Sequence, residues 1–98
     1  MKIRLEYLIA YDIAVTKTRT AIYNQLLAFG LTPVQKSLCW GFLSYPELNA
    51  LKRLFSHNLH KTDKALITRV DISKSRKVDF SLGTSPDMFQ DWQEYGNI

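Results

Sequence analysis

The sequence predicts an α+β fold in which two helices cover one face of an antiparallel sheet. Apolar residues repeat every second position in some segments and at helical spacing in others, and these segments follow the order strand, helix, two strands, helix, strand. A chain of 98 residues, 46% hydrophobic and 22% charged, has the composition of one small folded domain. This order predicts a ferredoxin-like βαββαβ sandwich, followed by an extra C-terminal strand.

The first predicted strand covers residues 3–13, and every odd position in it is apolar: Ile3, Leu5, Tyr7, Ile9, Tyr11 and Ile13. This alternation indicates a strand with one buried face. The even positions change from charged to apolar and back to charged: Arg4, Glu6, Leu8, Ala10 and Asp12. A carboxylate beyond two apolar neighbours is expected to be partly desolvated, so a cation or a proton must compensate its charge. Asp12 is therefore a candidate metal ligand.

A helix is predicted over residues 17–29, where Ile22, Leu26 and Phe29 recur at helical spacing. Thr16 is the expected N-cap, and Gly30 occupies the position at which a helix often ends with a left-handed residue.

Residues 31–43 are rich in strand formers and are expected to supply two hairpin strands, with the turn near residues 35–37. Gly41 indicates a bulge or a close backbone approach.

The second helix has a capping box made by Ser44 and Glu47, followed by an apolar stripe of Leu48, Leu51, Phe55 and Leu59. A strand is predicted over residues 65–72, with Leu66, Val70 and Ile72 on one face. A basic linker (residues 73–77) and a short strand (residues 78–82) complete a domain spanning residues 1–83, and residues 84–98 form an acidic and aromatic tail.

With both helices on one face, the other face of the sheet is open. Leu8 and Ala10 point away from the all-apolar positions of the first strand, so this open face is partly hydrophobic. An exposed apolar face of this size is unusual for a monomer. We therefore expect a homodimer formed through the sheets, with residues 78–82 added to the edge of the second copy.

The charge is unevenly distributed. Residues 1–83 contain all 13 Lys and Arg but only 6 of the 9 acidic residues, for a net charge of +7, whereas residues 84–98 carry −3. A basic body suits a polyanion such as nucleic acid, although a plain solvated surface would look the same. The candidate nucleic-acid-binding residues are Lys17, Arg19, Lys36, Lys74, Arg76 and Lys77.

Several function classes are disfavoured. No apolar stretch reaches the roughly 20 residues of a membrane helix, and the charged N-terminus does not resemble a secretory signal, so a cytoplasmic location is expected. Cys39 is the only cysteine, which excludes an internal disulfide, and it is interpreted as a small buried hydrophobe. His57 and His60 are interpreted as complementing the C-terminus of the second helix rather than binding metal.

The tail has aromatic residues at helical spacing, interleaved with acids: Phe89, Trp92 and Tyr95. They are candidates for binding a basic protein partner. Folding back onto the chain's own domain is the alternative.

An ordered set of residues extends over about the first 70 positions. It comprises Tyr11-Asp12-Ile13 at the end of the first strand, Arg19, Gly30, and the run Val34-Gln35-x-Ser37-Leu38-x-x-Gly41-x-Leu43. Together these residues resemble a known family, CRISPR-associated protein 2. The chain departs from the family pattern at four positions. Members often have an arginine at the position of Ala21 and a basic residue at that of Pro33. They often have an aromatic residue at the position of Cys39 and an acid at that of Trp40.

The resemblance implies a dimeric subunit that joins the CRISPR integrase subunit and holds duplex DNA during spacer acquisition. It also implies a metal-dependent endonuclease acting on RNA or double-stranded DNA, in which the Asp12 carboxylates of two protomers share Mg²⁺ or another divalent cation. Asp12 would then be both the catalytic residue and the metal ligand. Two alternatives stay open: a ribonuclease toxin of the virulence-associated type, and a non-catalytic ferredoxin-like binding module.

Overall fold

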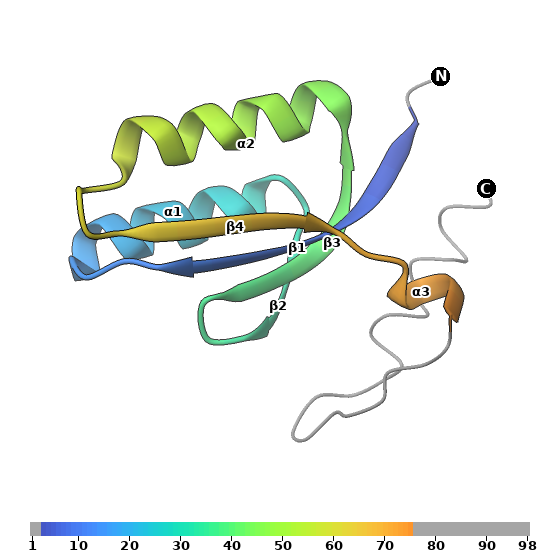
Figure 1. Ribbon diagram of the computed structural model, residues 1–98, viewed down its shortest axis with the longest axis horizontal. Helices are drawn as coiled ribbons and strands as arrows, with labels where there is room; N and C mark the ends of the chain where they lie inside the picture. The colour runs from blue at the N-terminus through green and yellow to red at the C-terminus, as the bar shows by residue number, and fades with distance from the viewer. Residues whose placement is uncertain (1–2, 76–98) are drawn as a thin grey trace.

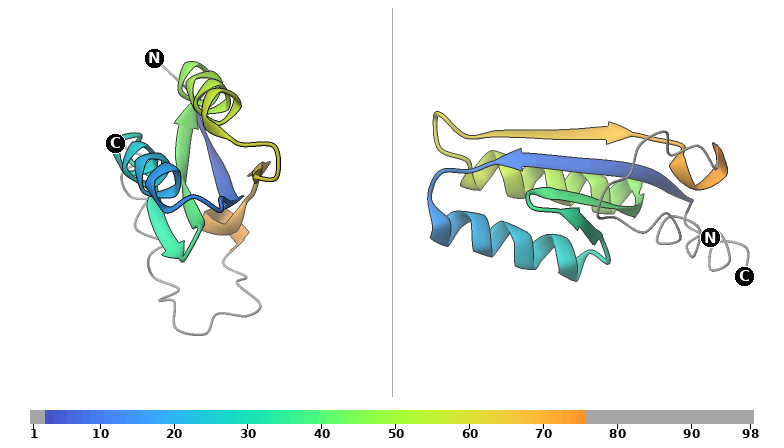
Figure 2. Two further views of the ribbon diagram at one scale, coloured as in Figure 1. Left: turned by 90° about the vertical axis from the view of Figure 1, so that its left-hand side faces the viewer. Right: turned by 90° about the horizontal axis from the view of Figure 1, so that it is seen from below.

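The computed structural model of the chain describes residues 3–75 and has the predicted βαββαβ order. The elements are β1 (Arg4–Asp12), α1 (Thr16–Ala28), β2 (Thr32–Gln35), β3 (Leu38–Ser44), α2 (Tyr45–Asn58), β4 (Lys64–Arg69) and a short α3 (Ile72–Ser75). The strands form one antiparallel sheet in the order β2-β3-β1-β4, and α1 and α2 cover the same face of it (Figures 1 and 2). The predicted fold class is confirmed. The predicted strand over residues 78–82 and the tail lie outside the described residues.

β1 is the central strand that organises both layers. Its odd side chains from residue 7 onward point toward the helices, and Tyr7, Ile9, Tyr11 and Ile13 are buried as predicted. The prediction is wrong at the start of the strand, where Ile3 is 77% exposed and Leu5 is 38% exposed. The pairing of β1 with β4 begins only at Tyr7, so these first residues lie beyond the four-stranded part of the sheet.

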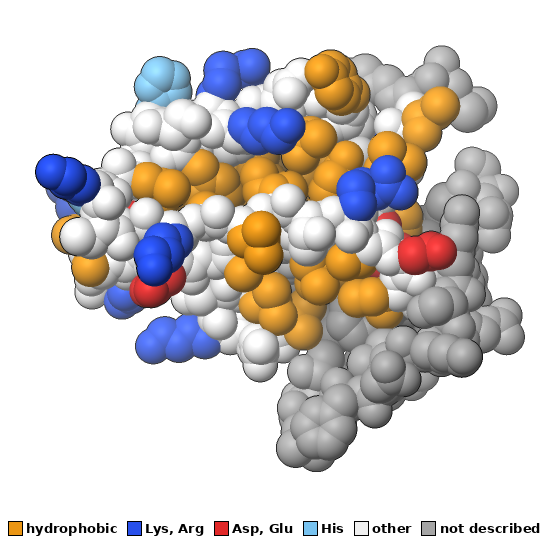
Figure 3. Space-filling view, in the orientation of Figure 1, with side chains coloured by type: hydrophobic (Ala, Val, Ile, Leu, Met, Phe, Trp, Pro, Cys, Tyr) orange, Lys and Arg blue, Asp and Glu red, His pale blue; other side chains and the backbone are white. Residues whose placement is uncertain are grey.

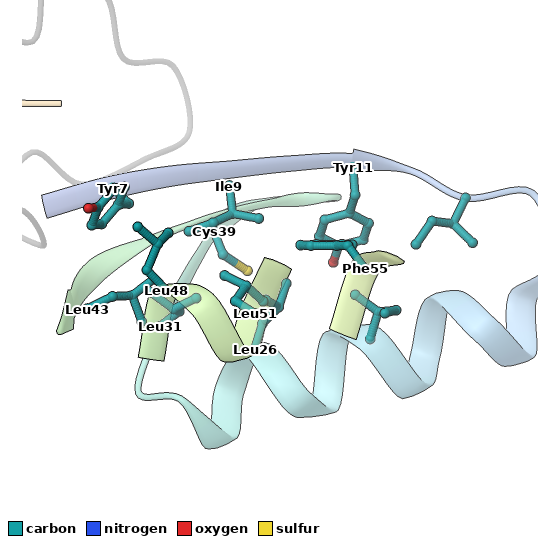
Figure 4. Packing of buried hydrophobic residues seen from close by; sticks show 12 residues of the cluster. Tyr7, Ile9, Tyr11, Leu26, Leu31, Cys39, Leu43, Leu48, Leu51 and Phe55 are labelled. Atoms are coloured by element: carbon teal, nitrogen blue, oxygen red, sulfur yellow. The ribbon is translucent and has the colours of Figure 1, made fainter. Parts of the chain in front are cut away.

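The hydrophobic core lies between the sheet and the two long helices. Ile9 from β1, Leu26 from α1 and Leu51 from α2 have no exposed surface and meet in the middle of this layer (Figure 4). Cys39 also belongs to this cluster, and burial raises the pKa of its thiol to about 11. The interpretation of Cys39 as a buried hydrophobe is confirmed.

The ends of α1 agree with the sequence-based prediction at the C-terminus but not at the N-terminus. Gly30 has a φ of +87°, the left-handed conformation expected after the helix. Thr16, however, is the first helical residue rather than the cap, because Val15 occupies the N-cap position and no side chain caps the helix. The Thr16 hydroxyl instead accepts a hydrogen bond from the Arg19 guanidinium at 3.2 Å.

The β2–β3 hairpin turns where it was expected. Lys36 and Ser37 connect the strands, and Ser37 has a φ of +62°. A Cβ atom on Gly41 would lie 2.7 Å from Leu31 Cδ2, so β3 approaches the end of α1 closely at this residue. The irregularity in the ladder lies in β2, between Pro33 and Gln35, and not at Gly41.

The capping box of α2 is present as predicted: the Glu47 amide donates to the Ser44 hydroxyl, and the Ser44 amide donates to the Glu47 carboxylate at 2.8 Å. Leu48, Leu51 and Phe55 bury the predicted stripe, and Leu59 packs against it half-buried.

The segment after α2 departs from the prediction. β4 ends at Arg69, whereas a strand to residue 72 was expected, and Ile72 begins α3 instead. The bonds of Ile72 and Ser73 to Glu6, described below, turn the chain away from the strand direction. No helix among residues 3–75 is long and apolar enough to cross a membrane.

Candidate metal site and nucleic-acid interface

The face of the sheet opposite α1 and α2, called the open face below, carries the even residues of β1. Leu8 is paired with Trp40 of β3, and Ala10 is paired with Leu38 of β3 and Leu66 of β4. Directly paired residues point to the same side, so these apolar side chains share the open face. Leu66 is 60% exposed. Figure 3 shows hydrophobic side chains gathered over the strands, with Lys and Arg side chains around them.

Asp12 stands at one end of the open face, where β1 finishes. Its carboxylate is exposed, and within residues 3–75 it makes no hydrogen bond or ion pair. The partial desolvation expected from the sequence is therefore absent in a single chain and would require a second copy. A hollow of about 240 Å³ lies beside Asp12, with Ala10, Lys64 and Leu66 among its lining residues.

Lys64 is a site residue that the sequence analysis missed. It is the residue of β4 paired with Asp12, which places an exposed ammonium group on the same face as the carboxylate. No periodic signal in the sequence reports this pairing, because the two residues are 52 positions apart and the register depends on the tertiary fold.

The loop that follows Asp12 is tied to the loop before β4. The Asp63 carboxylate accepts hydrogen bonds from the Ala14 amide at 3.1 Å and from the His60 amide at 2.9 Å. These two bonds hold the pKa of Asp63 below its ordinary value. They tie the loop after β1 to the loop before β4, the two strands that carry Asp12 and Lys64.

The structure brings only some of the predicted basic residues together. Arg19 makes no ion pair with Asp12 and instead donates a hydrogen bond to the Ile13 carbonyl at 2.8 Å. Arg19 and Lys36 line one pocket near the β2–β3 turn, and Lys17 is exposed in the first turn of α1. Lys74 belongs to α3, at the other end of the sheet (Figure 1). The remaining predicted site residues lie outside the described part of the chain: Arg76, Lys77, Phe89, Trp92 and Tyr95.

A second carboxylate on the open face was also missed. Glu6 is only 4% exposed, and its oxygens accept hydrogen bonds from the Trp40 indole and the Ser73 hydroxyl, both at 2.6 Å. The amides of Ile72 and Ser73 donate to it as well, at 3.1 Å and 3.3 Å. Glu6 thus anchors α3 against the sheet. In the sequence it is only one of the charged even positions of the first predicted strand, which gives no signal of this role.

The described carboxylates can be compared with the ligands that a metal ion requires. Among residues 3–75 no three His, Cys, Asp or Glu side chains cluster, so one chain does not enclose an ion. Mg²⁺ does not need such a cage, because it is usually held by one or two carboxylates together with phosphate oxygens and water. A single exposed carboxylate, doubled by a second copy, fits that requirement.

The comparisons with known proteins decide the family. The family model described as "CRISPR associated protein Cas2" matches residues 5–78. This chain belongs to the Cas2 family. The resemblance seen in the sequence is thereby confirmed.

One curated Cas2 relative matches over its whole length. It is the "CRISPR-associated endoribonuclease Cas2 1" of Francisella tularensis subsp. novicida (strain U112), 56% identical over 98 residues, which is 100% of both chains.

Two solved structures share the fold. The "hypothetical protein TT1823 from Thermus thermophilus" has a TM-score of 0.64 and 29% identity, covering 69% of this chain and 83% of that one. A structure described as "cas2" has a TM-score of 0.64 and 19% identity, covering 85% of this chain and 87% of that one, and supports the fold alone.

Proposed function

We propose that this Cas2-family chain is a CRISPR adaptation protein: a homodimer that binds nucleic acid and cleaves it with a divalent metal ion held by Asp12. The observation that carries the proposal is the placement of Asp12. It is an exposed carboxylate, without a hydrogen bond inside the described residues, at the end of an apolar sheet face. Membership of the Cas2 family speaks against the toxin alternative, and a non-catalytic binding module becomes an outcome of the experiment.

The proposed homodimer buries the open face. Leu66 is largely exposed and lies beside Ala10. Among the described strands β4 is an edge strand, so an apolar surface and a row of backbone groups are both available to a second copy. Face-to-face packing would bring the two Asp12 carboxylates toward each other and remove water from around them. Two close carboxylates repel, so a cation between them becomes favourable.

Replacing Leu66 with Lys tests this interface. We expect the wild-type chain to sediment as a dimer at micromolar concentration, and Leu66→Lys to shift it toward monomer, because a charge would be buried in the interface. Leu27→Lys, at an exposed position of α1 on the opposite side of the sheet, is the matched control and should remain dimeric. A monomeric wild-type chain would refute the interface.

The metal proposed for this site is Mg²⁺, because the donors are carboxylate oxygens. When bound, it would neutralise the carboxylates and stabilise negative charge on a phosphodiester group. Lys64, beside Asp12 on the same face, adds a positive charge that attracts the nucleic-acid backbone. The Asp63 bonds hold the two residues in place for this role.

The nucleic acid is proposed to contact Lys17, Arg19 and Lys36, and also Lys74 of α3 at the far end of the sheet. Arg76 and Lys77, which lie outside the described residues, are proposed to contribute as well. RNA and double-stranded DNA both present the phosphates that such residues bind. The relative from Francisella tularensis is named an endoribonuclease, which favours RNA as the substrate to test first.

In adaptation the dimer would hold duplex DNA together with the integrase subunit, which is proposed to bind the acidic tail through Phe89, Trp92 and Tyr95. Pull-down of the integrase with a chain lacking residues 84–98 tests this, and undiminished recovery would reject the role of the tail.

The catalytic proposal is tested by Asp12→Asn. We expect Mg²⁺-dependent cleavage of RNA or double-stranded DNA to fall by at least about 100-fold, the scale at which loss of one charge-stabilising group is felt, while nucleic-acid binding is retained. Asp71→Asn, at another exposed carboxylate, is the matched control and should cleave like the wild type. Cleavage that survives in Asp12→Asn would refute the assignment, and nucleic-acid binding without cleavage in the wild type would establish a binding module.

A further inference from the structure

A second pocket lies on the other side of β1 from the Asp12 hollow, between α1 and the β2–β3 hairpin. Its volume is about 300 Å³, and its lining includes Tyr11, Arg19, Tyr23, Gln35, Lys36 and Ser37. Pockets for small molecules begin at about this size. The pocket therefore has room for a ligand of one nucleotide and for little more.

The pocket has a cationic character. Arg19 and Lys36 both line it, and none of its described lining residues is acidic. Arg19 is held in place by its bonds to the Ile13 carbonyl at 2.8 Å and to the Thr16 hydroxyl at 3.2 Å. A guanidinium group has five N–H donors, so an arginine fixed by two bonds still has donors for an anion, and its fork geometry suits phosphate.

Two tyrosines supply aromatic surface next to these cations. The Tyr11 ring is fixed against Phe55, with ring centroids 6.4 Å apart, and points from β1 into the layer between sheet and helices (Figure 4). Burial raises the pKa of the Tyr11 phenol, and the neighbouring Cys39 and Tyr23 raise it further. Tyr11 and Tyr23 both line the pocket. Tyr23 is half-buried on α1, so part of its ring is accessible from the pocket.

The hairpin side of the pocket is rigid and polar. The Tyr11 amide donates to the Ser37 carbonyl at 3.1 Å, which ties the turn to β1. The amide group of Gln35 can donate and accept hydrogen bonds, as the edge of a nucleobase requires. The pocket thus combines a preformed phosphate-binding group, an aromatic surface and a polar edge.

We propose that this pocket binds one phosphorylated nucleotide, with its phosphate on Arg19 and Lys36 and its base against Tyr23. The proposal deepens the proposed function, since the nucleotide would be either a free nucleoside monophosphate or the terminal nucleotide of a nucleic-acid strand. Both sources present the same chemistry. Base stacking on an aromatic side chain tolerates any base, so selectivity for the phosphate should exceed selectivity for the base.

The test is an NMR titration of the isotope-labelled full chain with uridine 5′-monophosphate, and with uridine as the phosphate-free comparison. We expect saturable shift changes at residues 19–23 and 35–37, and affinity weaker by at least about 10-fold for uridine, because charged hydrogen bonds are lost. Tyr23→Leu, which keeps an apolar side chain without the ring, should weaken binding by roughly 5-fold or more. Tyr45→Ala, at a tyrosine that is 73% exposed on α2, is the control.

A second arm identifies the source of the nucleotide. A short single-stranded oligonucleotide with a 5′-phosphate binding more tightly than the same strand without it would assign the pocket to strand ends, and equal binding of the two, with uridine monophosphate still bound, would assign it to free nucleotides.

The absence of saturable binding at millimolar uridine monophosphate, or binding unchanged in Tyr23→Leu, would overturn the proposal. Because Asp12 does not line this pocket, Asp12→Asn should bind the nucleotide normally. Failure of the nuclease proposal and failure of the pocket are thereby distinguishable.

Discussion

The two carboxylates on the open-face side of β1, Glu6 and Asp12, have opposite surroundings. Glu6 is buried under α3 and accepts hydrogen bonds from Trp40, Ile72 and Ser73. The Asp12 carboxylate is exposed and makes no hydrogen bond within the described part of the chain. They stand six residues apart on the same strand and face. The comparison teaches that residue type and strand position do not decide the role of a carboxylate; the donors around it do.

The energetics explain why these roles differ. Burying a charged group is costly unless hydrogen bonds replace its lost water, and the donors from β3 and α3 meet that requirement for Glu6. A carboxylate so fully bonded has little capacity left for a metal ion. The Asp12 carboxylate retains its full capacity to accept hydrogen bonds or to bind a cation. It loses contact with water only when the open face is covered. Glu6 is therefore structural, and Asp12 is the carboxylate that stays available for the proposed metal ion.

The largest effect that separates the two carboxylates is expected in stability. Glu6→Gln should lower the free energy of unfolding by about 1.5–3 kcal/mol, because one charged acceptor for buried donors becomes an amide. Asp12→Asn should not lower it, because the Asp12 carboxylate has no bond to lose within the described residues and the change removes the repulsion between two carboxylates in the proposed dimer. Urea denaturation at equal monomer concentration measures both, and equal losses in the two variants would remove the distinction.

A smaller effect concerns the loop that follows Asp12. Because hydrogen bonds from His60 and Ala14 lower the pKa of Asp63 below its ordinary value of 3.8, ionised Asp63 stabilises the folded state above that pH. This stabilisation should decline as the pH falls below 3.8 and through the lower folded pKa. Asp63→Asn should lack this part of the pH dependence.

Thermal unfolding of the wild type and Asp63→Asn between pH 2 and pH 6 provides the measurement. The two profiles should differ most at the upper end of the range and converge at the lower end. A constant difference across the range would mean that the bonds of Asp63 add nothing to holding this loop.

The sequence by itself determined the local features of the fold. Alternation in β1, the stripe and capping box of α2 and the left-handed Gly30 all depend on residues within a few positions of one another, and all are present. The same alternation predicted an open face that carries Asp12. Local periodicity reports which face a residue occupies, because strand and helix geometry repeat at constant intervals.

Only the tertiary structure decided what stands next to each residue on those faces. Trp40 reaches Glu6 across 34 positions and Ser73 reaches it across 67, while Asp63 reaches Ala14 across 49. The pairing of Lys64 with Asp12 and the meeting of Tyr11, Tyr23 and Lys36 in one pocket have the same origin. Such neighbours are set by strand register and helix packing across the whole domain, so no short stretch of sequence can report them.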